Sequence, residues 1–217
     1  MTAFPARSGS GPSAALTLLI ATVVAYFIQM SAFTDVVRLL ALWPLGTPGT
    51  INISDGTTLQ TGFGLWQLVT YGFLHGGIGH LFFNMFALYM FGVPIERAWG
   101  TRRFLIFYFV CMIGAGLVQL LVAELAGEIY PTIGASGAVF GLLLAFGVMY
   151  PNTRIMLLFP PIPMRAKWFV IGYGILTLVF GMTGTMPGIA HFAHLGGMLF
   201  GLVMILYWGR QDYYRRR

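Results

Sequence analysis

The chain has 217 residues, of which 58% are hydrophobic and only 8% are charged. Soluble domains carry about 25% charged residues, so the composition excludes an ordinary soluble protein and indicates a polytopic membrane protein. A single cysteine, Cys111, excludes an intramolecular disulfide.

Six apolar stretches are predicted to cross the membrane and to form an all-α bundle. They cover residues 14–33, 79–95, 104–125, 135–150, 168–182 and 189–208. The membrane domain therefore extends over residues 14–209, between a short cytoplasmic tail at 1–13 and a basic cytoplasmic tail at 210–217. A long loop is expected at 34–77, and its Trp43 and Trp66 are candidates for rings at the membrane interface.

The basic residues predict the orientation of the bundle. With six spans, both termini lie on one side, together with the loops after the second and fourth spans. All but one of the 12 Lys and Arg residues fall on that side, and the exception is Arg38. By the positive-inside rule that side is cytoplasmic, so the net charge of +6 is a topology signal and no nucleic-acid partner is implied. No presequence precedes the first span, which favours a bacterial inner membrane over an organelle.

Ser136 is the first chemically suggestive residue. It lies at the head of the fourth apolar stretch, after Pro131, which disfavours a helix running through it. A serine at a helix start is most often only an N-cap. However, this stretch is shorter than the roughly 20 residues that cross a bilayer. A helix that begins inside the membrane must bury its free end in protein or place it in a water-filled cavity.

Two polar residues share one face of the second span. His80 and Asn84 are four residues apart and are expected near the extracytoplasmic end, as is Ser136. Intramembrane polar side chains face the bundle interior or a cavity, although such a pair often only ties helices together. His75 precedes this helix and is expected to brace the long loop.

Glycine spacing offers a route by which a histidine could reach Ser136. Gly137 and Gly141 make a G-x-x-x-G face on the fourth span, and Gly197 and Gly201 make another on the sixth. Such faces allow close helix approach, which would bring His194 toward Ser136 in a nucleophile–base arrangement. His191, three residues earlier, is the rival base.

A zinc site is the competing use of the four histidines. No H-E-x-x-H motif is present, because His191 and His194 are three apart without a glutamate between them. The soluble-hydrolase motif G-x-S-x-G also fails, since position 138 is Ala. The serine explains more of the pattern than a metal does.

These residues together resemble the rhomboid family of intramembrane serine proteases. The similarity rests on His75-x4-His80-x3-Asn84, on Gly134-Ala135-Ser136-Gly137 and on His194 with Gly197 and Gly201. It is supported by Trp66 in the long loop and by Glu96, Trp99 and Gly100 after the second span. Each motif alone is modest, but the ordered set is highly specific.

The resemblance implies a six-helix bundle, a Ser–His dyad without a third carboxylate, and no cofactor or metal. Ser136 would be the nucleophile and His194 the general base. The Ser136 N–H, His80 and Asn84 would form the oxyanion hole, and Gly134 and Ala135 would shape the turn before the nucleophile. Substrates would be transmembrane proteins in the surrounding lipid, entering past the fifth span and residues 184–188; the oligomeric state stays open.

Two departures from the family pattern stand out. Gln67 follows Trp66 where an arginine is frequent, so bracing of the loop by that arginine is lost. Phe140 stands where a tyrosine often stacks on the base, which keeps the ring and loses the hydroxyl. Neither departure touches the dyad. A pseudoprotease that binds helices without cutting them is the non-enzyme alternative, and a small-solute transporter is the other.

Overall fold

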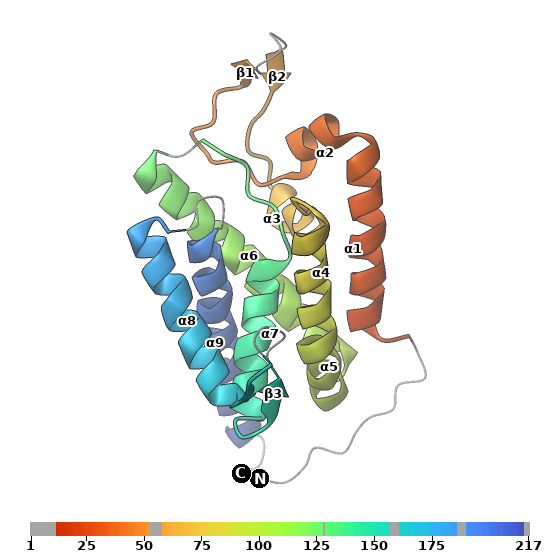
Figure 1. Cartoon of the computed structure of the whole chain (residues 1–217), viewed down its shortest axis with the longest axis vertical. Helices are drawn as coiled ribbons and strands as arrows, with labels where there is room; N and C mark the ends of the chain where they lie inside the picture. The colour runs from red at the N-terminus through yellow and green to blue at the C-terminus, as the bar shows by residue number, and fades with distance from the viewer. Residues whose placement is uncertain (1–11, 53–57, 128, 157–160, 186–189, 215–217) are drawn as a thin grey trace.

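The structure, a computed structural model, describes residues 12–52, 58–127, 129–156, 161–185 and 190–214. Long helices lie side by side in a bundle, and a short β-hairpin lies at each end (Figure 1). The helical elements are α1 (Ala14–Ser31), α2 (Phe33–Leu40), α3 (Gln67–Thr70), the 3-10 helix η1 (Tyr71–Phe73), α4 (Ile78–Ala87), the π-helix η2 (Leu88–Gly92), α5 (Val93–Trp99), α6 (Thr101–Ala126), α7 (Ser136–Met149), α8 (Ala166–Thr183) and α9 (His191–Tyr214). The hairpins pair β1 (Thr50–Asn52) with β2 (Thr58–Gln60) and β3 (Arg154–Met156) with β4 (Pro163–Arg165).

The expected all-α polytopic membrane fold is confirmed. Within the described residues, five helices are long and apolar enough to cross a membrane: α1, the continuous run Ile78–Trp99, α6, α8 and α9. α7 is the shorter apolar helix that the sequence predicts. The start of α1 and the end of α9 lie at the same end of the bundle (Figure 1). α9 continues to Tyr214, so residues 210–214 of the predicted cytoplasmic tail are helical. Most of the predicted tail at 1–13 lies outside the described residues.

The segment at 34–77 is folded rather than a plain loop. The first predicted span, residues 14–33, breaks at Ala32, and the separate amphipathic helix α2 begins at Phe33. The segment then contains the β1–β2 hairpin, α3 and η1. Trp43 is only 3% exposed and donates to the Arg38 carbonyl at 3.1 Å, so the prediction of an interfacial ring is wrong for Trp43. Trp66, at 58% exposed, remains available to the interface.

A glutamate ties the first helix to the second span. The carboxylate of Glu96 accepts hydrogen bonds from the Ser13 hydroxyl at 2.5 Å and from the N–H groups of Ala14 and Ala15 at 2.8 and 3.0 Å. It also accepts one from the Thr101 hydroxyl at 2.8 Å. The first N–H groups of a helix lack intrahelical partners, so Glu96 both caps α1 and joins it to α5 and α6.

α7 forms the centre of the bundle. Ten of its 14 residues are buried, and it packs mainly against α6 and α9. Its sequence is rich in Gly and Ala, which allows neighbouring backbones to approach closely. The apolar side chains on the outer faces of α1, α8 and α9 are exposed, as expected for surfaces that contact lipid.

Candidate active site

Ser136 is the first residue of α7, as predicted, but it does not cap the helix. Ala135 occupies the N-cap position, and no side chain caps the helix there. The Ser136 hydroxyl instead lies 2.8 Å from Nε2 of His194, 58 residues later in the chain. The serine hydroxyl is therefore engaged with a titratable group rather than with its own helix.

The chain enters α7 through a segment held from both sides. Thr132 and Leu42 exchange backbone hydrogen bonds of 2.9 and 3.0 Å, and the Gly134 N–H donates to the Tyr71 carbonyl at 2.9 Å. Gly134 has a φ of +128°, which strongly favours glycine. In Figure 1 this segment descends from the top of α6 before α7 begins. Backbone hydrogen bonds from this segment to Leu42 and Tyr71 thus hold the start of α7 below the end of the bundle.

The two glycine faces meet, as their spacing predicts. A Cβ on Gly197 would collide with the backbone carbonyl of Gly137, and a Cβ on Gly201 would lie 3.4 Å from the Gly141 Cα. No side chain separates α7 from α9 at these points. Because His194 lies one turn before Gly197, this backbone contact carries its ring to Ser136.

Aromatic stacking orients His194. The Phe140 ring lies 4.2 Å from the imidazole, centroid to centroid, with an interplanar angle of 10°. Tyr173 of α8 also stacks on Phe140, with ring centroids 5.2 Å apart. In the part of the chain that the structure describes, no carboxylate is hydrogen-bonded to His194. The plane of the His194 ring is therefore set by stacking, whereas in a serine–histidine–aspartate triad a carboxylate orients the imidazole.

His191, the rival base, is turned elsewhere. Its Nε2 lies 3.1 Å from the carbonyl oxygen of Thr185, after the end of α8. Its ring centroid is 6.3 Å from that of His194, and it makes no hydrogen bond with Ser136. Of the two histidines, the geometry pairs His194 with the serine.

His80 also lies close to the serine. A Cβ on Gly134 would be 3.0 Å from the His80 Nε2 and 3.7 Å from the Ser136 Oγ. The Gly76 N–H donates to Nδ1 of His80 at 3.3 Å. Because Nδ1 accepts this bond, the neutral ring must carry its proton on Nε2. His80 therefore presents an N–H donor toward the space next to Ser136.

Asn84 is buried one turn further along α4. Its amide nitrogen donates to the His80 carbonyl at 2.9 Å. An amide nitrogen has two hydrogens, so a second donor remains after this bond.

His75 is held through its main chain. Gln29 of α1 accepts from the His75 N–H at 2.9 Å and donates to the His75 carbonyl at 3.0 Å. The His75 side chain is 1% exposed, and neither ring nitrogen has a hydrogen-bond partner among the residues that the structure describes. Its ring meets the His80 ring edge to face at 5.0 Å. Gln29 of α1 therefore fixes the backbone of His75, next to Gly76, whose N–H donates to His80. Bracing of the loop by His75 stays a prediction.

No metal centre emerges from these histidines. Within the described residues, no group of three or more His, Cys, Asp or Glu side chains is placed to hold a metal ion.

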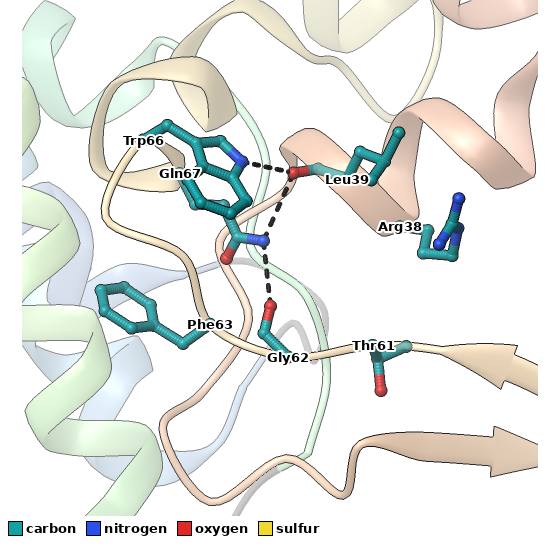
Figure 2. Close-up of a pocket in the computed structure, with 7 residues that line it drawn as sticks. All are labelled: Arg38, Leu39, Thr61, Gly62, Phe63, Trp66 and Gln67. Atoms are coloured by element: carbon teal, nitrogen blue, oxygen red, sulfur yellow. Dashed lines mark hydrogen bonds between the residues drawn. The ribbon is translucent and has the colours of Figure 1, made fainter.

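The sequence suggests that replacing the family's arginine by Gln67 removes a brace of the long loop, but the Gln67 side chain itself braces that loop. Figure 2 shows its amide nitrogen bonded to the carbonyls of Gly62, at 3.0 Å, and Leu39, at 3.4 Å. Its oxygen accepts from the Trp43 N–H at 3.2 Å. A cavity of about 270 Å³ opens here, and Ser136 and His194 do not line it.

The sequence reasoning missed Gln29 and Gln67. Gln29 carried a usable signal, because a polar residue inside an apolar span is costly and must find a partner. Gln67 carried none, because its three partners are backbone groups, two of them in the distant residues Leu39 and Trp43.

Known proteins are similar to this chain over most of its length. A family model described as the rhomboid domain matches residues 62–211. RHOMBOID-like protein 4 of Arabidopsis thaliana is 32% identical over 148 residues, which are 64% of this chain and 33% of that protein. Rhomboid protease GluP of Bacillus subtilis is 32% identical over 139 residues, or 63% of this chain and 24% of that protein. Rhomboid protein 1, mitochondrial, of Saccharomyces cerevisiae is 30% identical over 139 residues, or 63% and 40% of the two chains.

The chain spans less than half the length of each of these three relatives. The family model nevertheless covers more than half of the chain, from the segment before α3 to residue 211, near the end of α9. This protein belongs to the rhomboid family.

Proposed function

We propose that this protein is a serine endopeptidase that cuts transmembrane segments of other membrane proteins inside the bilayer. Ser136 is the nucleophile and His194 is the general base and acid. The observation that carries the proposal is the 2.8 Å hydrogen bond between the Ser136 Oγ and the His194 Nε2, formed between α7 and α9 at a helix start within the bundle. Nucleophile and base within hydrogen-bond reach are the minimum for this chemistry.

In acylation, the Ser136 Oγ attacks the carbonyl carbon of the scissile peptide bond while His194 Nε2 takes the hydroxyl proton. The tetrahedral intermediate collapses when His194 gives that proton to the leaving amine, and the C–N bond breaks. Water then attacks the acyl-enzyme with His194 again as base, which releases the carboxylic acid and restores Ser136.

Three donors are proposed for the oxyanion. The Ser136 N–H makes no backbone hydrogen bond within the described residues, as expected for the first N–H of a helix. The His80 Nε2–H faces the same space, and Asn84 has a second amide hydrogen to offer. Donors already in place cost little reorganisation when negative charge develops.

The substrate must present an accessible carbonyl, so its helix must unwind locally near the cut. We propose entry past α8, by the family resemblance and because α8 has the smallest buried share of the five long apolar helices, 17%. Part of the predicted gate at 184–188 lies outside the described residues.

We also propose that both termini are cytoplasmic, that the active site faces the extracytoplasmic side, and that the membrane is a bacterial inner membrane. The asymmetry of Lys and Arg supports the orientation, and relatives occur in a bacterium as well as in eukaryotes. Cysteine accessibility at positions 47 and 152, combined with fractionation of the native host, tests both statements. If a cysteine at position 152 were labelled from outside the cell, the proposed orientation would be wrong.

The decisive experiment uses the whole chain reconstituted in liposomes with a panel of reporter transmembrane substrates and a fluorophosphonate probe. Wild type is expected to cleave and to be labelled, whereas Ser136→Ala and His194→Ala do neither. Ser31→Ala, at the exposed end of α1, is the matched control and retains both. A wild type that binds substrates without cleavage or labelling would instead establish a pseudoprotease. If cleavage persists in His194→Ala but is lost in His191→Ala, the general base is His191 instead.

A further inference from the structure

Three basic residues lie close together at the N-terminal end of α8. This is the end of the bundle opposite the β1–β2 hairpin (Figure 1). Arg154 and Arg165 are directly opposite each other in the β3–β4 hairpin, and Lys167 is in the first turn of α8. Like charges opposite each other on paired strands are destabilising. Arg154 and Arg165 are both exposed, so nothing in the described residues covers them.

None of the acidic side chains that the structure describes forms an ion pair with these three cations. No acidic residue lies in the first turn of α8. Arg38 and Asp35, in the segment between α1 and the β1–β2 hairpin, form the ion pair found among the described residues, and none of the three cations takes part in one. The positive end of the α8 dipole adds to the repulsion. The positive-inside rule needs basic residues on this side but does not require three of them at one point.

The surroundings indicate what supplies the negative charge. The Lys167 ammonium lies 5.3 Å from the centre of the Trp168 ring, and Trp168 is 57% exposed. Exposed tryptophans at the end of a spanning helix mark the level of the lipid headgroups. Directly beyond it, Ile171 and Ile175 expose an apolar face along α8. A ligand seated here would contact cations at one end and an apolar helix face along its length.

We propose that residues Arg154, Arg165 and Lys167 form a binding site for the phosphate headgroup of an anionic phospholipid, whose acyl chains lie along the exposed face of α8. A phosphate oxygen accepts hydrogen bonds from the two guanidinium groups and from the ammonium group. Basic clusters beside spanning helices attract anionic lipids by roughly 1 kcal/mol for each cation, or about fivefold in affinity.

The test measures binding rather than proteolysis, so it is independent of the proposed function. The detergent-purified whole chain is titrated with phosphatidylglycerol, and bound lipid is counted by native mass spectrometry. Phosphatidylcholine with the same acyl chains is the zwitterionic comparison. The triple variant Arg154→Gln/Arg165→Gln/Lys167→Gln is expected to lose affinity for phosphatidylglycerol by about fivefold per cation, on the order of a hundredfold in all.

The matched control removes the same number of charges from the same side of the bundle, through Arg97→Gln/Arg102→Gln/Arg210→Gln at three exposed positions. It is expected to bind phosphatidylglycerol within about twofold of wild type. If the triple variant cannot be purified, the single variants Arg154→Gln and Arg165→Gln provide the test, each with an expected partial loss of affinity for phosphatidylglycerol. An equal loss in the control, wild-type affinity in the cluster variant, or displacement of the lipid by inorganic phosphate at equal concentration would each overturn the proposal.

Discussion

The imidazole of His194 lies flat against the ring of Phe140, with centroids 4.2 Å apart and planes inclined by 10°. In the described part of the chain this contact, and not a carboxylate, restrains the ring that pairs with Ser136. The Phe140 ring is itself stacked on Tyr173, whose other neighbour in the stack is Phe169. The orientation of the proposed base therefore depends on packing between α7, α8 and α9.

Phe140→Leu is expected to lower kcat by about three- to tenfold, the range that an aromatic pair contributes, with KM little changed. The ring is lost while an apolar side chain remains, so the base turns more freely. Phe140→Tyr keeps the stack and is the control, with kcat near that of wild type. Steady-state cleavage of a reporter substrate in liposomes measures both. An unchanged kcat in Phe140→Leu would show that stacking does not position His194.

Gly134→Ala is expected to reduce kcat by roughly 10²–10³, the cost of losing one oxyanion donor. A Cβ there would lie 2.8 Å from the His80 Cε1, and the φ of +128° suits only glycine, so His80 must move. Gly127→Ala is the matched control, because Gly127 also has a positive φ, of +65°, but nothing lies within 4 Å of its Cβ position. Cleavage rate and melting temperature are measured together for both variants. Equal activity losses would attribute the effect to backbone strain alone.

Gly197→Ala is expected to destabilise the fold by about 1–3 kcal/mol, as overpacking does, because its Cβ would strike the Gly137 carbonyl. Gly209→Ala, in the same helix but with no atom within 4 Å, gains helix propensity and should be neutral or slightly stabilising. Thermal unfolding in detergent gives the comparison. Equal melting temperatures for the two variants would mean that the α7–α9 contact adjusts without cost.

Gln67→Leu is expected to cost about 1–3 kcal/mol, because it leaves the Trp43 N–H and two carbonyls without the amide that joins them. The segment at 34–77 should also be cut faster by an added protease. Gln211→Leu, near the end of α9 and without a hydrogen bond to the described residues, provides the control. If Gln67→Leu kept the wild-type melting temperature and protease resistance, Gln67 would not brace the segment at 34–77.

The membrane class and the identity of the long helices followed from local properties of the chain. The apolar stretches predicted all the long helices to within a few residues, apart from the C-terminal extension of α9 to Tyr214. The first apolar stretch predicts one helix to residue 33, whereas α1 ends at Ser31 and the chain turns at Ala32. Hydropathy does not register such a break, because both sides of it are apolar. The short fourth helix and its start at Ser136 were predictable because Pro131 and the length of the apolar run are local signals.

Hydropathy, charge asymmetry, glycine spacing and an ordered set of motifs, all present in the sequence alone, determined the all-α membrane fold and the family. Tertiary structure decided which histidine meets Ser136, because His191 and His194 are both near the start of one helix and only packing distinguishes them. It also decided the tautomer of His80 and the roles of Gln29 and Gln67. Each of these depends on hydrogen bonds whose geometry is set only in the folded chain. The physical reason is that helix formation depends on neighbours along the chain, whereas the geometry of a site depends on the distance between helices, which side chains and backbones set together.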